Sequence, residues 1–237
     1  MKYKDIITYE NPKSPIAEAF RTLRTNIQFS SIDKTVKTIV ITSPGPGEGK
    51  STISVNTAVT MAQSEKKVLL IDCDLRKPKV HTFFKLHNGQ GLTNILVEDV
   101  KCKDVVHETD LARGLYVLTA GPIPPNPAEL LGSNKMKNFI EDMKNEHDYI
   151  ILDSPPVGML TDAAILSTIA DGTILVCAVG QANIEATKGA KALLDKVNAN
   201  ILGVVLNKVP VKSGGYYKYH YYSYYNYDYY AEGENND

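Results

Sequence analysis

The sequence predicts an α/β protein: a mostly parallel sheet with helices on both faces. Short runs of Val, Ile and Leu alternate along the chain with longer segments of helical periodicity, which is typical of repeated βαβ units. Most of these runs are continuously apolar, as expected for strands that are buried on both faces of a parallel sheet. Glycine-rich or acidic residues follow several runs, at the sheet edge where open α/β sheets bind their ligands.

The first apolar run, Ile39–Thr42, leads into a loop with three glycines and two prolines, and a helix opens after it. A strand, a glycine-rich loop and a helix in this order form a phosphate-binding loop of the P-loop NTPase kind. Its backbone N–H groups and the helix N-terminus present partial positive charge to a polyphosphate. The residues expected to bind the nucleotide are Gly45, Gly47, Glu48, Gly49, Lys50, Ser51 and Thr52.

Two side chains of this loop have specific expected roles. Lys50 should reach the β- and γ-phosphates of ATP, and the Ser51 hydroxyl should ligate Mg²⁺. The general pattern G-x-x-x-x-G-K-[ST] requires glycine at the position that Pro44 occupies in this chain. An ordinary Gly/Pro turn before a helix is therefore the alternative, and the acidic strand ends argue against it.

Two further apolar runs end in carboxylates. Val68–Ile71 is followed by Asp72 and Asp74, and Ile150–Leu152 is followed by Asp153. Because parallel strands end at one edge of the sheet, these acids are expected to face the phosphate loop. Asp74 and Asp153 would then bind Mg²⁺ directly or through water. Acids at a strand end can also cap the next turn, and for Asp72 and Asp74 this alternative stays open.

Residues 13–29 are predicted to form a helix that Ser14 caps and Pro15 opens. A flanking stripe, separate from the apolar one, carries Glu18, Arg21 and Arg24, because a step of three residues drifts by about 60° around the helix. This stripe fits either a solvated face or an ion-paired contact with another subunit, and its spacing alone favours the solvated face. The expected apolar stripe consists of Ile16, Phe20, Leu23 and Ile27.

The remaining elements continue the alternation, except for residues 79–112, where only short helices in 91–99 and around Val105 are indicated. Asn126 is expected to cap a helix that begins at Pro127, with Glu129 placed close to a capping box. Asn207 follows the last strand, where it would contact the adenine or close a turn. The other predicted strands are Leu115–Thr119, Gly172–Val179 and Ile201–Asn207, and the other predicted helices span 135–147, 162–170 and 183–198.

Bulk composition excludes several classes of protein. The formal charge is −1, with Lys+Arg 26 and Asp+Glu 27, so wholesale nucleic-acid binding has no electrostatic basis. No apolar run approaches the roughly 18 residues that span a bilayer, and the N-terminus lacks the apolar core of a signal peptide. The 3 scattered cysteines and 5 histidines show no metal-ligand spacing, which suits a reducing cytosol and argues against disulfides and zinc. The histidines are expected at the surface.

The chain is expected to form one domain over residues 1–210 and a separate tail over 211–237. The tail has almost no aliphatic residue and should be mobile, because it cannot bury enough apolar area to offset its ordering entropy. Stacking on nucleic acid would need more positive charge than this segment carries. We interpret its tyrosines as phosphoacceptors: Tyr216, Tyr217, Tyr219, Tyr221, Tyr222, Tyr224, Tyr225, Tyr227, Tyr229 and Tyr230.

This combination of motifs resembles the bacterial tyrosine autokinases of capsule and exopolysaccharide synthesis, in the Gram-positive form where the cytoplasmic kinase is a separate chain. The resemblance covers almost the whole sequence, and Pro44 agrees with the family's loop. The stripe Glu18, Arg21 and Arg24 looks like the family's E-x-x-R-x-x-R oligomerisation motif, which reverses the preference for a solvated face. The matching segments are SPGPGEGKST, VLLIDCDLRKP, GPIPPNPAELL, YIILDSPPVGMLTDA and the tyrosine cluster.

The resemblance implies an ATP- and Mg²⁺-dependent kinase that phosphorylates its own tail in trans within a closed ring, an octamer. It also implies a transmembrane activator of the polysaccharide co-polymerase kind, a cognate phosphotyrosine phosphatase, and a cytoplasmic location at the inner face of the membrane. For catalysis we expect Lys50 to act on the phosphates and Asp72 to orient the tyrosine hydroxyl and accept its proton. The division of roles between Asp72 and Asp74 stays open.

A second candidate is a partition-type ATPase, in which hydrolysis controls dimerisation and partner binding. The loop of that class carries an early lysine, K-G-G-x-G-K-[ST], at the position that Gly45 occupies here, and the class lacks a tyrosine tail. Both differences favour the kinase. A structural adaptor without nucleotide is disfavoured because Lys50, Ser51 and the three aspartates are all present.

Overall fold

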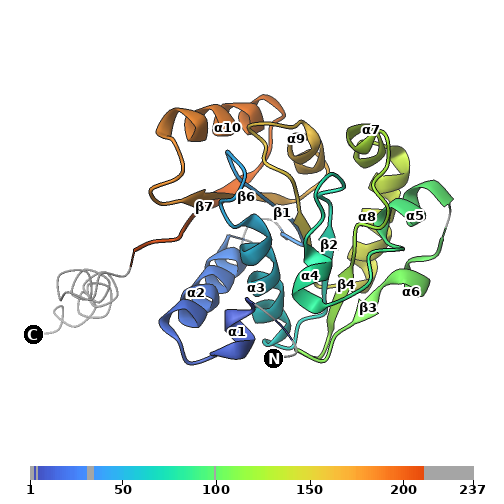
Figure 1. Cartoon of the computed structure of the whole chain (residues 1–237), viewed down its shortest axis with the longest axis horizontal. Helices are drawn as coiled ribbons and strands as arrows, with labels where there is room; N and C mark the ends of the chain where they lie inside the picture. Colours follow the sequence, from blue (N-terminus) through green and yellow to red (C-terminus); the bar gives the residue numbers. More distant parts are fainter. Residues whose placement is uncertain (1–2, 4, 31–34, 99, 211–237) are drawn as a thin grey trace, which may run out of the picture. The chain divides into compact units, whose positions relative to one another are not determined.

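The computed structural model describes residues 3, 5–30, 35–98 and 100–210 (Figure 1). These residues contain a seven-stranded sheet in the order β3-β4-β2-β5-β1-β6-β7, in which all neighbours are parallel except β3 and β4. The predicted α/β class with a mostly parallel sheet is confirmed. The strands are β1 (Thr38–Thr42), β2 (Val68–Asp72), β3 (His107–Glu108), β4 (Leu115–Leu118), β5 (Tyr149–Asp153), β6 (Gly172–Ala178) and β7 (Ile201–Asn207).

Helices cover both faces of the sheet, as expected (Figure 1). Alternate strand residues divide the core: Ile39 and Ile41 pack on one face, whereas Val40 packs on the other. The first face is covered by α1 (Ile7–Glu10), α2 (Pro15–Phe29), α3 (Lys50–Ala62) and α4 (Val80–Phe84). The second is covered by α5 (Leu92–Glu98), α6 (Cys102–Val105), α7 (Pro127–Leu131), α8 (Asn134–Glu146), α9 (Asp162–Ser167) and α10 (Ile184–Lys196).

The central strands bring the functional residues to one edge of the sheet. Strand β5 lies between β2 and β1, and Asp153 at its end is in register with Asp72 on β2 and with Ile41 on β1. The phosphate loop follows β1 directly and leads into α3. The register therefore places the acidic ends of β2 and β5 beside the loop, as the sequence predicts.

Three short elements, α1, α4 and β3, were not predicted. Each has five residues or fewer, which is too short for a helical or strand period to register. In α2, the cap is confirmed, because the Ser14 Oγ accepts the Ala17 N–H at 3.1 Å.

The expected apolar stripe of α2 is wrong at one end. Ile16 is 54% exposed, whereas Ala17, Phe20 and Ile27 are buried. The buried face is centred on these three residues together with Arg24, and Ile16 lies about 60° away from its centre. Arg24, expected on a flanking stripe, instead lies over α3, where its Nη1 donates to the Thr60 carbonyl at 3.2 Å.

Two other local predictions are wrong. Asn126 does not cap α7: its ψ of 66 departs from the extended conformation of a capping residue, and its amide donates instead to Glu129 Oε2 at 2.7 Å. His147, expected at the surface, is buried at the end of α8, where its Nδ1 contacts the Met143 carbonyl at 3.1 Å. Burial lowers the pKa of His147, so the ring is neutral near pH 7.

The chain divides into two units, residues 1–207 and residues 208–237. The boundary expected at residue 210 stays a prediction, and the tail, residues 211–237, lies outside the described residues. Within the described ranges, no helix combines the length and the apolar character needed to cross a membrane.

Candidate functional site

The loop between β1 and α3 has the backbone of a phosphate cradle. Gly47 and Gly49 adopt φ values of 75 and 93, which side chains other than glycine strongly disfavour. Gly49 is the N-cap of α3, and a Cβ there would lie 2.1 Å from Asn207 Nδ2. Helix α3 begins directly after the loop, so its first N–H groups and the positive end of its dipole face the loop.

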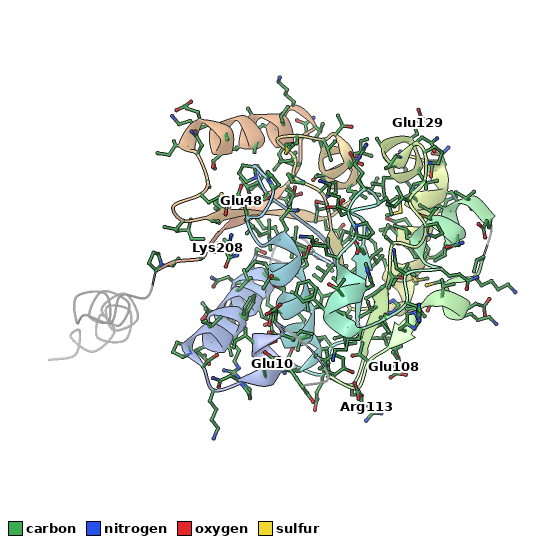
Figure 2. All side chains as sticks on the ribbon, in the orientation of Figure 1. Glu10, Glu48, Glu108, Arg113, Glu129 and Lys208 are labelled. Atoms are coloured by element: carbon green, nitrogen blue, oxygen red, sulfur yellow. The ribbon has the colours of Figure 1, made fainter. Side chains whose placement is uncertain are left out.

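Glu48 holds this loop against the ends of β6 and β7 (Figure 2). Its carboxylate is 2% exposed and accepts the Gly45 N–H at 2.7 Å and the Ala178 N–H at 2.9 Å. Its carbonyl accepts the Asn207 amide at 2.8 Å. Glu48 was expected to bind nucleotide, but its side chain is committed to the loop. Asn207 likewise makes a loop contact that the sequence did not indicate.

The segment after β5 supports the loop from the other side. The Val157 N–H donates to the Ser43 carbonyl at 3.0 Å, and the Thr42 hydroxyl donates to the Pro155 carbonyl at 2.8 Å. Gly158 packs directly on Pro44, because a Cβ at position 158 would lie 2.3 Å from the Pro44 carbonyl oxygen. Pro44 is buried in this contact, so the residue that departs from the general loop pattern has a packing role.

Asp72 is completely buried at the end of β2. Its Oδ2 accepts the N–H groups of Lys79 and Val80, both at 2.9 Å, and its Oδ1 accepts the Asp74 N–H at 3.2 Å. The capping alternative is therefore realised, because these donors belong to the turn and the first residues of α4. Burial raises the pKa of Asp72 well above its usual range, and the charge of Asp153 raises it further.

Asp153 is 1% exposed at the end of β5. Its Oδ1 accepts the Ser54 hydroxyl at 2.8 Å, and its Oδ2 is buried without a hydrogen-bond partner among the described residues. Burial raises the pKa of Asp153 to about 6, although the nearby Ser51 hydroxyl, the Lys50 charge and Ser54 act to lower it.

This arrangement fits a bound divalent cation. No three His, Cys, Asp or Glu side chains in the described part of the chain could hold a metal by themselves. Mg²⁺ needs no such cage, since it is usually held by one or two carboxylates together with substrate phosphates and water. The Asp153 Oδ2, which has no hydrogen-bond partner among the described residues and lies beside Ser51, would supply one such ligand, and the partly buried Asp74 lies in the same group of acids.

One ion pair at the site was not predicted. The Arg76 guanidinium contacts both carboxylate oxygens of the buried Asp162, at 3.2 and 3.3 Å. It ties the loop after β2 to the first residue of α9. Both residues fall in segments that carry the family resemblance, LRKP and TDA, and that was the only signal in the sequence.

The remaining expected residues are on α2, in the first turn of α3, or outside the described structure. Glu18 and Arg21 form an ion pair of 2.6 Å on the exposed face of α2, and Arg21 also donates to the Pro12 carbonyl at 2.5 Å. Thr52 is partly buried in the first turn of α3. The ten tail tyrosines, 216–230, lie outside the described residues.

We expect Gly158→Ala to weaken ATP binding and to lower the free energy of unfolding by about 1–3 kcal/mol, because the added methyl group must displace Pro44. Titration calorimetry and urea denaturation measure the two effects. Gly189→Ala is the matched control: it lies in α10 with nothing within 4 Å, and should stabilise by up to about 1 kcal/mol without changing affinity. Unchanged ATP affinity in Gly158→Ala would contradict the support that we assign to this contact.

The raised pKa of Asp153 predicts a pH-dependent stability of the nucleotide-free protein. The folded state binds this proton more tightly than the unfolded chain, so the contribution is complete below about pH 4 and is lost as the pH rises through about 6. The unfolding free energy of Asp153→Asn, relative to the unsubstituted protein, should rise by on the order of 2 kcal/mol from pH 4 to 7. Urea denaturation at several pH values measures this, with the exposed Asp195→Asn as control. A pH-independent difference would show that Asp153 titrates normally.

Comparison with known proteins places these features in a family. The family model described as an AAA domain matches residues 36–203, which include the phosphate loop and all three aspartates. The septum site-determining protein MinD of Pyrococcus horikoshii, solved with Mg-ADP, aligns with a TM-score of 0.63 at 25% identity, covering 75% of this chain and 72% of that one.

Tyrosine kinases are more similar to this chain. Tyrosine-protein kinase YwqD of Bacillus subtilis is 44% identical over 217 residues, which is 92% of this chain and 91% of the relative. The crystal structure of the chimerical protein CapA2B2 has a TM-score of 0.84 at 41% identity, covering 89% of this chain and 92% of that one. The chain therefore belongs to the bacterial tyrosine-protein kinases of the AAA-domain family.

Proposed function

We propose that this kinase transfers the γ-phosphoryl group of ATP to its own C-terminal tyrosines, in trans within a ring oligomer, and thereby regulates capsule or exopolysaccharide synthesis. The observation that carries the proposal is the convergence of Lys50, Asp72 and Asp153 at one sheet edge. Strand β7 ends at the same edge, where Asn207 bonds to the phosphate loop. The tyrosine-rich segment follows in the chain.

In this proposal each residue of the loop has one task. The loop N–H groups and Lys50 bind the phosphates of ATP, with Gly47, Glu48, Gly49 and Thr52 contributing their backbone, whereas the Gly45 N–H is held by the Glu48 carboxylate and shapes the loop. Ser51, Asp74 and Asp153 would hold Mg²⁺, which when bound neutralises charge on the β- and γ-phosphates.

We assign proton acceptance to Asp72. Its Oδ2 is committed to two N–H groups of the turn, whereas its Oδ1 accepts one hydrogen bond, of 3.2 Å, from the described residues and would accept a second from a phenol that enters the site. Burial raises the pKa of Asp72, which brings it closer to the pKa of a phenol, near 10. In a loose phosphoryl-transfer transition state the proton leaves late, so orientation of the hydroxyl matters more than prior deprotonation.

Trans phosphorylation requires an assembly that brings neighbouring copies together. Glu18 and Arg21 present an exposed ion pair on α2, and a head-to-tail contact made by this face would close into a ring, an octamer by family resemblance. Each phosphate adds about −1.5 to −2 charges to the tail, and Asp72, Asp74 and Asp153 would repel it. The ring is therefore proposed to assemble unphosphorylated and to dissociate when phosphorylated.

The proposed partners follow from the family. They are a transmembrane activator of the polysaccharide co-polymerase kind, whose cytoplasmic end promotes ATP binding, and a cognate phosphotyrosine phosphatase that resets the tail. The kinase would then work in the cytoplasm, peripherally at the inner face of the membrane. Nucleic acid is not among the partners, in keeping with the formal charge of −1.

Incubation of the full chain with labelled Mg·ATP and the activator's cytoplasmic fragment should place label on tyrosines within 216–230, mapped by mass spectrometry. Lys50→Met should lower the label by more than about 100-fold, because the positive charge that stabilises the transferred phosphoryl group is lost. Asp72→Asn should lower transfer while ATP affinity is kept. A chain with all ten tyrosines changed to Phe is the control for other acceptors.

One outcome of that experiment would contradict phosphoryl transfer to tyrosine, and another would contradict only the choice of the tail as acceptor. Release of free phosphate with no label on tyrosine would favour the partition-type ATPase. Label that resists tail substitution would place the acceptor elsewhere in the chain.

Mass measurement in solution tests the assembly cycle. The dephosphorylated chain and Lys50→Met should form the ring, whereas the phosphorylated chain should form a smaller assembly, because the site's aspartates repel the phosphorylated tail. Arg21→Ala should also be smaller, and Arg113→Ala, an exposed arginine far along the chain (Figure 2), should not. An assembly size that does not change with phosphorylation would overturn the cycle.

A further inference from the structure

Two large apolar side chains are exposed on the loops that flank the acids of β2. Strand β2 lies between β4 and β5 in the sheet. The loop after β4 carries Ile123 and the loop after β5 carries Met159, and each side chain is 65% exposed. Single exposed apolar residues are common on protein surfaces. These two are distinguished by the strands that precede their loops, because β4 and β5 are the two neighbours of β2, whose end carries Asp72.

Contacts within the chain hold the Met159 loop in place. Gly158 packs on the Pro44 carbonyl of the phosphate loop, one residue before Met159. Three residues after it, Asp162 forms the ion pair with Arg76, two residues beyond Asp74. The exposure of Met159 is therefore imposed by backbone that is tied to the catalytic loops on both sides.

The Ile123 loop is held in a similar way. Gly121 and Asn88 exchange two hydrogen bonds of 2.9 Å, and Pro124 and Pro127 are buried beyond the exposed side chain. Helix α7, which this loop enters, packs against α9, which the Met159 loop enters. The two exposed side chains thus precede two helices that contact each other.

We propose that Ile123 and Met159 form an apolar platform that binds the ring of the acceptor tyrosine, supplied by the C-terminal segment of a second copy. The platform rests on the proposed function and deepens it. An isoleucine and a polarisable methionine suit an aromatic ring, and Met sulfur contacts ring edges favourably. With its ring held between these side chains, the phenol would point its hydroxyl toward the acids of β2.

The tail matches such a platform in composition and in length. Ten of the residues from Tyr216 to Tyr230 are tyrosines, so a surface that recognises a ring, and not a flanking sequence, can accept them one after another. The residues between Asn207 and Tyr216 extend to about 30 Å, so length alone permits transfer in cis or in trans, and the choice of a second copy rests on the proposed ring.

The test uses transfer between two full-length chains. The acceptor is Lys50→Met, which keeps its tyrosines, and the enzyme is a chain whose ten tail tyrosines are Phe. At saturating Mg·ATP, the double change Ile123→Ala and Met159→Ala should raise KM for the acceptor about tenfold, because apolar contact with the ring is lost. The kcat and the ATP affinity should change less than about twofold, since neither side chain contacts the phosphates in this proposal.

Two variants separate the platform from damage to the fold. Met159→Leu keeps an apolar side chain of similar volume and should leave KM within about twofold. Val97→Ala removes a side chain of similar exposure, 58%, from α5 and should have no effect.

An unchanged KM in the double variant would overturn the platform, and so would an equal loss of ATP affinity. If KM is unchanged but stimulation by the activator fragment is lost, the side chains bind the activator and the proposal is wrong. Failure of the enzyme chain that keeps Ile123 and Met159 to transfer any phosphate to Lys50→Met would overturn the proposed function and the platform together. Transfer with unchanged KM overturns the platform alone.

Discussion

The site depends on two carboxylates that the sheet register forces together in a buried place. Asp72 and Asp153 are opposite each other on adjacent strands, and both are almost fully excluded from solvent. Burial and mutual repulsion raise the pKa of Asp72, and burial raises that of Asp153 against the opposing charge of Lys50. Two buried carboxylates this close to each other need nearby positive charge to stay ionised. A nucleotide-bound magnesium ion together with Lys50 would supply that charge.

The surroundings of this pair are built to keep it in place. Glu48 holds the phosphate loop to β6, Asn207 holds it to β7, and Gly158 packs on its Pro44. The loop follows β1, and contacts from the ends of β6 and β7 and from the segment after β5 position it. These contacts explain how a segment rich in glycine can have a single conformation. Asp72 supports a different segment, because its hydrogen bonds to Lys79 and Val80 order the turn that follows β2. One carboxylate thus serves both the fold and, in our proposal, the chemistry.

The similarity to MinD and to the tyrosine kinases shows how one scaffold serves two purposes. The phosphate loop and the acidic strand ends lie within residues 36–203, which the family model matches, and the MinD of Pyrococcus horikoshii was solved with Mg-ADP. Outside that core, this chain carries an exposed Glu18–Arg21 pair on α2, the exposed side chains of Ile123 and Met159, and a tyrosine-rich terminus. These are the features through which we propose that the kinase selects its acceptor.

Local patterns in the sequence determined the class of fold, the order of its main strands, the phosphate loop and the three acids, because continuous apolar runs and glycine spacing are local signals. Tertiary packing decided the rest. The Arg76–Asp162 pair, the packing of the buried His147 ring against Tyr116 and the role of Glu48 join residues that are distant in the chain, so no local pattern contains them. The rotation of α2 that exposes Ile16 and turns Arg24 toward Thr60 was likewise decided by α3, because packing against a neighbouring helix determines which face of a helix is buried.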